Sequence, residues 1–244
     1  MIDGAFVDDR GRPVPAVDAA EMLEVDRIAI EETGPNLYQM MENAGRNLAR
    51  LVRTILGDGW QAGHVVVLAG TGGNGGGGVT AGRHLLNHGA RVSAVITDES
   101  RMGEVPAQQL EVFRHAGGDV LDSPPDDADL TVDAIIGYSL RGAPRGRALE
   151  LIEWANVSAA PILSLDVPSG IDSTTGESLG TVISATTTMT LALPKAGLAN
   201  EHAGALVLAD IGIPREVYVR LGMPAGAEVF DGRYRVPLRR NLSA

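Results

Sequence analysis

The chain has 244 residues, of which 44% are hydrophobic and 21% are charged, and its formal net charge is −11. This length is enough for one large α/β domain or two small ones. The negative charge argues against a nucleic-acid partner, because an acidic surface repels the phosphate backbone. The chain has no cysteine, which excludes disulfides, thiolate metal sites and a cysteine nucleophile and fits a reducing compartment.

The N-terminal end does not have the pattern of a secretion signal. Residues 1–12 contain Asp3, Asp8 and Asp9 and no apolar run, whereas a signal peptide needs an apolar core. No segment has the roughly 18 continuous apolar residues that a membrane-spanning helix requires. We therefore expect a cytoplasmic protein that is not bound to a membrane.

The first part of the chain predicts a helical N-terminal extension. Residues 1–15 are expected to form an irregular arm. From Asp18, and again over residues 37–56, apolar residues recur every three or four positions, which predicts two helices with one apolar face each. Gly57 then ends the second helix.

From residue 64 onward, short apolar strands alternate with helices. Residues 64–69 form an almost unbroken apolar run, as is typical of a strand covered on both faces. We expect strands at 64–69, 92–96, 130–136, 162–165, 186–191 and 205–209, and helices at 79–87, 107–116 and 148–156. This alternation predicts a Rossmann-like, doubly wound α/β fold, in which a mostly parallel sheet lies between two layers of helices.

No linker, repeat or low-complexity segment divides the chain, so we expect a single domain over residues 1–244 with its core at about 18–222. The residues after Pro224 contain four arginines among few apolar side chains. These are Arg233, Arg235, Arg239 and Arg240. The pattern indicates a docked or flexible tail.

The strongest candidate for a ligand site is the run Gly70-Thr71-Gly72-Gly73-Asn74-Gly75-Gly76-Gly77-Gly78. Glycines allow backbone N–H groups to approach a ligand, and the N-terminus of the following helix adds partial positive charge. The run is not a Walker loop, because no Lys-Ser or Lys-Thr follows it. Its spacing fits the dinucleotide fingerprint, with Asp98 as a possible ribose ligand. We expect it to hold a phosphate-bearing small molecule.

Three further polar residues lie at or near the ends of predicted strands. Asp133 lies inside an apolar strand and needs a cation or hydrogen bonds to offset its burial, or it caps a nearby helix or turn. Asp166 follows the strand at 162–165 and precedes a Pro-Ser-Gly turn, so it is a candidate general acid–base, although turns favour the same residues. Lys195 follows another strand, where it lines the same edge or is a surface lysine.

Several short motifs follow one another along the chain in an order that is typical of one family. They are Asp26-Arg27, Met41-Glu42-Asn43-Ala44-Gly45, the glycine run followed by Ala81-Gly82-Arg83-His84-Leu85, Val132-Asp133-Ala134, Asp166-Val167-Pro168-Ser169-Gly170-Ile171-Asp172, Pro194-Lys195, and Asp210-Ile211-Gly212-Ile213-Pro214. In these motifs the chain resembles the NAD(P)H-hydrate epimerases, the YjeF N-terminal domain family. The resemblance covers about residues 18–222.

The resemblance implies an isomerase that interconverts the R and S forms of hydrated NADH and NADPH, which carry a hydroxyl on the nicotinamide ring. It implies a potassium ion held by Asn74, Asp133 and Ser169, and oxygen ligands suit such a hard cation. It implies Asp166 as the acid–base group for loss and return of the hydroxyl, assisted by Lys195. The substrate-binding residues would be Gly73, Asn74, Gly75, Gly76, Gly77, Gly137, Tyr138, Ser139, Leu140, Arg141, Gly142, Ala143 and Asp166. It also implies a homodimer through the N-terminal helices and a separate dehydratase in the same pathway.

The chain departs from the family pattern at three positions. The family's glycine loop usually reads Asn-Asn-Gly-Gly-Asp-Gly, whereas Gly73 and Gly77 replace its first Asn and its Asp here. Tyr138 stands where the family usually has Thr. We therefore expect an intact ion site and an altered ligand site. An epimerase, a relative that acts on another phosphate-bearing metabolite, and a non-catalytic binding module or scaffold remain open, and Asp166 argues against the last.

Overall fold

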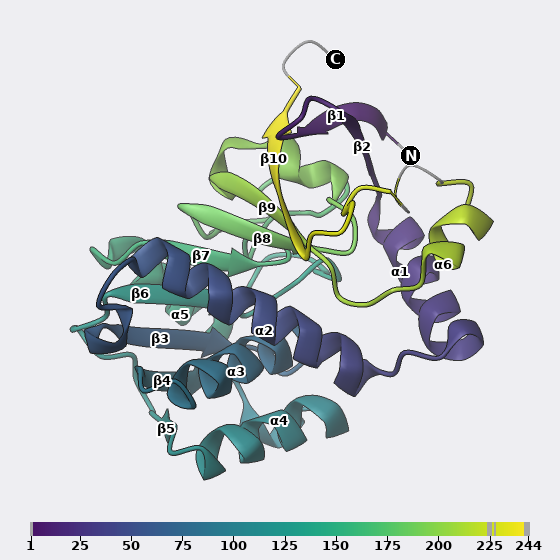
Figure 1. Ribbon diagram of the computed structural model, residues 1–244. Helices are drawn as coiled ribbons and strands as arrows, with labels where there is room; N and C mark the ends of the chain where they lie inside the picture. The colour runs from purple at the N-terminus through teal and green to yellow at the C-terminus, as the bar shows by residue number, and fades with distance from the viewer. Residues whose placement is uncertain (1, 224–225, 227, 242–244) are drawn as a thin grey trace.

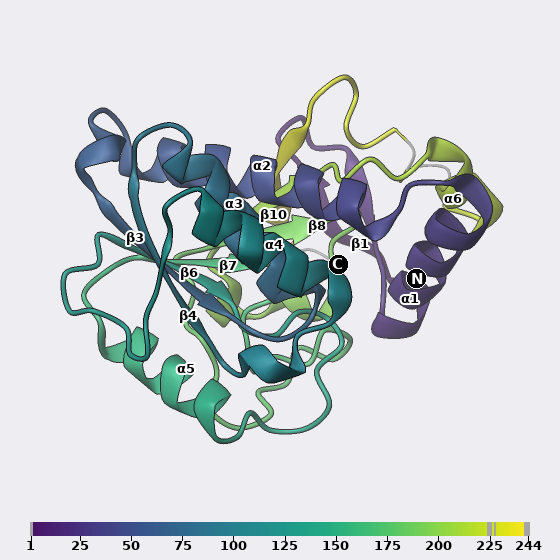
Figure 2. The same ribbon diagram turned by 90° about the horizontal axis from the view of Figure 1, so that it is seen from below.

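The computed structural model describes residues 2–223, 226 and 228–241, and its centre is a ten-stranded sheet. The strands lie in the order β2-β1-β10-β9-β8-β7-β6-β3-β4-β5. Helices cover both faces of the sheet, with α2, α3 and α4 on one face and α5 on the other (Figures 1 and 2). The expected three-layer α/β fold is therefore confirmed.

Seven strands, β3 to β9, lie side by side in the sheet, and every pair of neighbours among these seven is parallel. They are β3 (His64–Ala69), β4 (Arg91–Ile96), β5 (Asp119–Val120), β6 (Leu130–Ala134), β7 (Ile162–Leu165), β8 (Thr187–Leu191) and β9 (Ala205–Ala209). The chain runs from β3 outward to β4 and β5 and then returns to place β6 on the other side of β3. Open α/β sheets bind ligands at the carboxyl ends of the strands on either side of such a reversal.

The apolar run of β3 is buried because side chains on its two sides enter two different cores. Val65, Val67 and Ala69 pack in one hydrophobic cluster with α2 (Leu37–Leu56), α3 (Gly73–Leu86) and α4 (Glu104–His115). Val66 and Leu68 pack in another cluster with α5 (Arg147–Val157). The alternation follows from the period of two along a strand.

The helical extension begins with α1 (Ala19–Ile28), which Asp18 and Glu21 cap reciprocally through a capping box. A π-helical segment, Ala29–Thr33, continues it and ends at Gly34, whose φ of 108° lies in the left-handed region. Beside α1 lies α6 (Arg215–Arg220), which the sequence did not predict (Figure 1). Among the described helices, none is long and apolar enough to cross a membrane.

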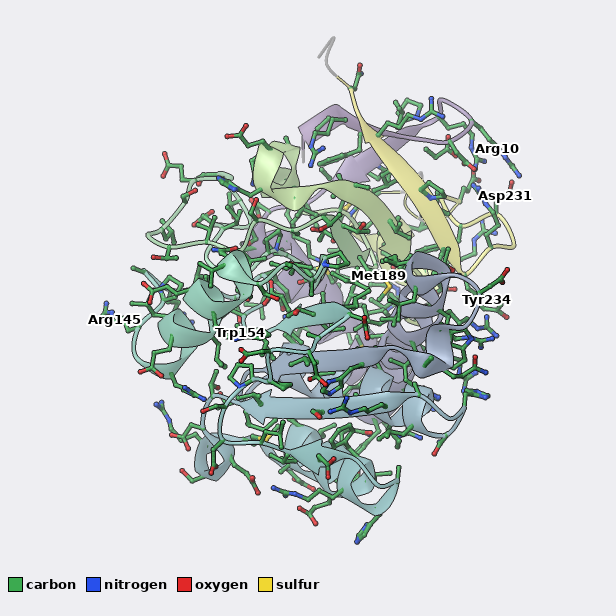
Figure 3. All side chains as sticks on the ribbon, turned by 90° about the vertical axis from the view of Figure 1, so that its left-hand side faces the viewer. Arg10, Arg145, Trp154, Met189, Asp231 and Tyr234 are labelled. Atoms are coloured by element: carbon green, nitrogen blue, oxygen red, sulfur yellow. The ribbon has the colours of Figure 1, made fainter. Side chains whose placement is uncertain are left out.

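Both ends of the chain contribute strands to the sheet, so the expected irregular arm is wrong, whereas the tail is docked, which is one of the two states expected for it. They are β1 (Ile2–Asp8), β2 (Pro13–Ala16) and β10 (Arg235–Arg240), and β10 pairs antiparallel with both β9 and β1. Arg10 forms an ion pair with Asp231, which joins the β1–β2 turn to the segment before β10 (Figure 3). In the same view Met189 of β8 lies in the interior, where it is fully buried. Residues 1, 224–225, 227 and 242–244 of the predicted arm and tail lie outside the described residues.

The glycine run is mostly helix rather than loop, because α3 begins at Gly73 and not near Val79. Close packing explains the glycines inside it. A Cβ on Gly75 would lie 1.9 Å from the carbonyl oxygen of Gly70, and one on Gly78 would lie 2.5 Å from Cβ of Ala134. These two glycines therefore let the first turns of α3 press against β3 and β6.

Candidate functional site

A cavity of about 460 Å³ lies where the strand order reverses, beyond the carboxyl ends of β3 and β6. The residues after β3, from Thr71 to Asn74, form one side of it, and Ile135 to Ser139, after β6, form another. The N-terminal helices supply an apolar wall that includes Met22, Met40 and Met41. The cavity therefore joins polar groups at a sheet edge to an apolar surface, as ligand pockets commonly do.

Asp166 lies in this cavity, directly after β7, in an uncommon backbone conformation. Its φ is 70°, in the left-handed region that costs a residue with a side chain about 1–3 kcal/mol. The backbone N–H of Asp166 donates to the carbonyl of Met189 at 2.7 Å. Its carboxyl group accepts hydrogen bonds from the backbone N–H of Tyr138 at 3.2 Å and of Leu191 at 3.3 Å. The surrounding loops thus hold this carboxyl group in one orientation.

Lys195 pairs with Asp166 inside the protein. Its Nζ lies 2.5 Å from Oδ1 of Asp166 and donates to the carbonyl of Leu191 at 2.8 Å. The Lys195 side chain is only 1% exposed and that of Asp166 only 5%. The structure thus brings together the two residues that the sequence pattern singled out for catalysis, and it rules out a surface lysine.

Tyr138 connects Asp166 to an acid that sequence reasoning missed as a site residue. The Tyr138 hydroxyl donates to Oδ2 of Asp26 at 2.7 Å, and both residues line the cavity. Burial raises the pKa of Asp26, although the Tyr138 hydrogen bond and the charge of Lys195 oppose this. Burial, with the charge of Asp26, also raises the pKa of Tyr138. One feature of the sequence could have indicated it: Asp26 lies four residues after Met22, on the apolar side of a predicted helix.

The glycine run contributes to the cavity only in part. Gly73, Asn74 and Gly77 line it, whereas Gly75 and Gly76 are buried and do not. A Cβ on Gly76 would lie 2.5 Å from Sδ of Met41. Among the described residues, no side chain caps the N-terminus of α3, so its first backbone N–H groups remain available to an anion.

The second predicted ligand segment reaches the cavity only at its beginning. Gly137, Tyr138 and Ser139 line the cavity, but Leu140 and the residues 141–143 do not. A Cβ on Gly137 would lie 3.3 Å from the Asn74 amide and 3.4 Å from the Asp166 carboxyl group. The approach of these two side chains to Gly137 therefore brings the loops after β3, β6 and β7 together.

The residues expected to hold potassium also lie at this edge of the sheet. Asp133 is fully buried and accepts hydrogen bonds from the Ser164 hydroxyl, from the hydroxyl and backbone N–H of Ser169, and from the backbone N–H of Ile135. Hydrogen bonds thus compensate the carboxyl group, although burial still raises its pKa.

Two observations fit a cation beside these residues. Among the described residues, no Lys, Arg or His forms an ion pair with Asp133. Its carboxylate therefore accepts hydrogen bonds but has no positively charged partner among them. Oδ1 of the Asn74 amide accepts no hydrogen bond from the described residues, so this oxygen is free to bind a cation, whereas the buried Nδ2 is a donor and cannot. An amide, a carboxyl and a hydroxyl offer oxygen ligands, which suit a hard cation.

The YjeF-related protein N-terminus family matches residues 37–197. The chain is 49% identical to the NAD(P)H-hydrate epimerase of Dehalogenimonas lykanthroporepellens over 96% of each chain. It is 38% identical to the bifunctional NAD(P)H-hydrate repair enzyme Nnr of Hyperthermus butylicus, over 87% of this chain and 42% of that protein. The crystal structure of the yeast protein ynu0 superposes with a TM-score of 0.77 at 26% identity, over 86% of this chain and 94% of that one. The family match, the similarity over nearly the whole chain and the shared fold show that the chain belongs to the YjeF-related N-terminal family.

Proposed function

We propose that the chain is an NAD(P)H-hydrate epimerase, an isomerase that interconverts the R and S forms of hydrated NADH and NADPH. The observation that carries the proposal is the buried Asp166–Lys195 pair at the cavity, where the strand order reverses. The similarity to the Dehalogenimonas epimerase over 96% of both chains supports the same activity.

Asp166 is the residue that this proposal places at the reacting hydroxyl. An epimerisation of the hydrate breaks the bond between the ring carbon and its hydroxyl and forms it again, which requires a group that moves protons to and from oxygen. The backbone N–H groups of Tyr138 and Leu191 and the ammonium of Lys195 fix the Asp166 carboxyl group at this place. Such fixed donors reduce the reorganisation that the reaction requires.

The remaining surfaces of the cavity match the other parts of such a substrate. The uncapped N-terminus of α3 favours a phosphate, because its backbone N–H groups and helix dipole attract an anion. Met22, Met40 and Met41 offer an apolar wall for the ring. In this arrangement the nicotinamide end enters the cavity and the pyrophosphate lies along Gly72 and Gly73.

We also propose a potassium ion held by Asn74, Asp133 and Ser169, which would supply a positive charge next to the buried carboxyl group of Asp133. The support is the Asn74 amide oxygen, which accepts no hydrogen bond from the described residues, and the lack of a counter-charge for Asp133 there. The protein's own residues provide the acid–base group, so the ion is assigned a positioning role.

A measurement of epimerase activity tests the proposed function. A mixture of R and S NADH hydrate is treated with an S-specific dehydratase until the S form is consumed, and the protein is then added in potassium buffer. We expect faster loss of the R form, and about 100-fold or greater loss of that rate in the Asp166→Asn variant, because general acid–base groups contribute about that much. Asp172→Asn is the matched control, because Asp172 belongs to the same loop but accepts from the backbone of Thr174 and Thr175 outside the cavity.

Two other results would point elsewhere. A folded protein that does not accelerate loss of the R form of either NADH hydrate or NADPH hydrate would overturn the proposal. Because Tyr138 places a ring in the cavity, the search would then turn to other phosphate-bearing metabolites. Full activity in the Asp166→Asn variant would refute the role of Asp166 but leave the epimerase activity itself established.

A further inference from the structure

One residue of the cavity, Tyr138, holds two carboxyl groups apart. Its backbone N–H donates to Oδ2 of Asp166, and its hydroxyl donates to Oδ2 of Asp26. The length of the tyrosine side chain therefore separates the two acids, and both line the cavity together with Tyr138. Nζ of Lys195, which pairs with Asp166, lies 5.7 Å from the centre of the Tyr138 ring.

The environments of the two acids differ. Asp166 is in an ion pair with the ammonium of Lys195. Asp26 forms no ion pair among the described residues. Its carboxyl group accepts a hydrogen bond from the Tyr138 hydroxyl. Burial raises the pKa of Asp26, which favours its protonated form relative to an exposed aspartate. The cavity therefore holds one carboxylate with a counter-ion and one carboxyl group without a counter-ion.

Two separated acids match the stereochemistry of the reaction. To convert one epimer into the other, the oxygen must leave from one face of the ring carbon and return on the opposite face. A group that can give or take a proton is useful on each face, and inverting glycosidases, for example, place two carboxyl groups apart with room for water between them.

We propose that Asp26 is a second catalytic residue, which acts on the hydroxyl at the face of the ring carbon opposite to Asp166. The inference rests on the proposed epimerase function. One carboxylic acid protonates the departing hydroxyl, the carbon–oxygen bond breaks with its electron pair on oxygen, and water leaves while the ring nitrogen lone pair stabilises the carbon. Water then forms the new bond on the other face and gives its proton to the second carboxylate, so that no other reactant is needed.

The test compares epimerisation with exchange of the hydroxyl oxygen in ¹⁸O-labelled water. In the Asp26→Asn variant we expect about 100-fold slower epimerisation. One epimer should still exchange its oxygen at a rate within about tenfold of wild type, because Asp166 can still assist departure and return on its own face. Asp166→Asn should leave exchange in the other epimer only.

Two further variants test whether Asp26 takes part in the reaction or only maintains the structure of the site. Glu24→Gln removes another carboxylate of α1, one that pairs with Arg27 outside the cavity, and should leave both rates unchanged. Tyr138→Phe keeps the ring but removes the hydroxyl that holds Asp26, so it should slow epimerisation less than Asp26→Asn and bias oxygen exchange toward the same epimer.

Three results would overturn the inference. Asp26→Asn could retain the epimerisation rate of the wild type. It could also reduce oxygen exchange in both epimers in parallel with epimerisation, which would mean that Asp26 only shapes the site. A wild-type protein without epimerase activity would remove the proposed function, and the inference with it, whereas the first two results leave the proposed function intact.

Discussion

Nζ of Lys195 lies 2.5 Å from Oδ1 of Asp166, and both side chains are almost fully buried. The two residues come from the loops after β7 and β8, which end at the same edge of the sheet. Buried ion pairs contribute little net stability, because removing both charges from water costs about as much as their attraction returns. The pair is therefore better explained by the chemistry of the cavity than by the stability of the fold.

Removing one partner of this pair should destabilise the protein strongly. Lys195→Met leaves the carboxylate of Asp166 buried without its cation, and such a change typically costs about 3–5 kcal/mol. Urea denaturation measures the free energy of unfolding. The double variant Lys195→Met/Asp166→Asn should be more stable than Lys195→Met alone, because no unpaired charge remains. If the loss in the double variant equals the sum of the losses in Lys195→Met and Asp166→Asn, the two side chains do not interact.

The glycines of α3 should divide into packing positions and cavity positions. Gly78→Ala places a methyl group 2.5 Å from Cβ of Ala134, and we expect a loss of about 1–3 kcal/mol from overpacking. At Gly73 the position that a Cβ would occupy has no atom within 4 Å, so Gly73→Ala should change stability by less than about 1 kcal/mol. Thermal and urea denaturation of the two variants measures the difference. Equal losses would contradict the packing explanation.

The sequence was a good guide where apolar periodicity is strong. The strands at 64–69, 162–165 and 205–209 and the helix at 37–56 are confirmed with the same bounds. The glycine run was misleading, because high glycine content has the same appearance in a flexible loop and in a tightly packed helix. The packing of the glycines becomes visible only from their neighbours in the fold, such as Ala134, Met41 and the Gly70 carbonyl.

The terminal strands could not be predicted because their partners are distant in the chain. In β10, Pro237 and three arginines obscure the buried alternation of Val236 and Leu238. Proline is tolerated there because the pairing with β1 begins at Leu238, so Pro237 has a strand partner on one side only. Asp26 was missed as a site residue for a similar reason, since its partner Tyr138 is 112 residues away.

His84 should make stability depend on pH. Burial lowers the pKa of His84 below its ordinary 6.5, and the charges of Arg83 and Arg46 act in the same direction, against Glu42. The unfolded chain therefore takes up a proton at this position before the folded chain does. The stability that this residue contributes is complete above pH 6.5 and is lost as pH falls through its folded pKa.

The His84→Gln variant should lose less stability than wild type between pH 7 and 5.5, as measured by urea denaturation at each pH. His88→Gln is the matched control, because His88 is exposed just after the end of α3, and it should behave as wild type. A steeper dependence in His84→Gln than in wild type would contradict the direction assigned to the shift.

Potassium should stabilise the folded protein more than other monovalent cations at equal ionic strength. An ion that binds only the folded state adds about 2.7 kcal/mol when its concentration is 100 times its Kd. The melting temperature in KCl should therefore exceed that in LiCl. Asn74→Ala should abolish the difference, because it removes the amide oxygen that is proposed to bind the ion and that accepts no hydrogen bond from the described residues. Asn87→Ala, at the other end of α3, should retain it. Equal melting temperatures for the wild type in both salts would remove the ion site, and the four hydrogen bonds to Asp133 would then be its whole compensation.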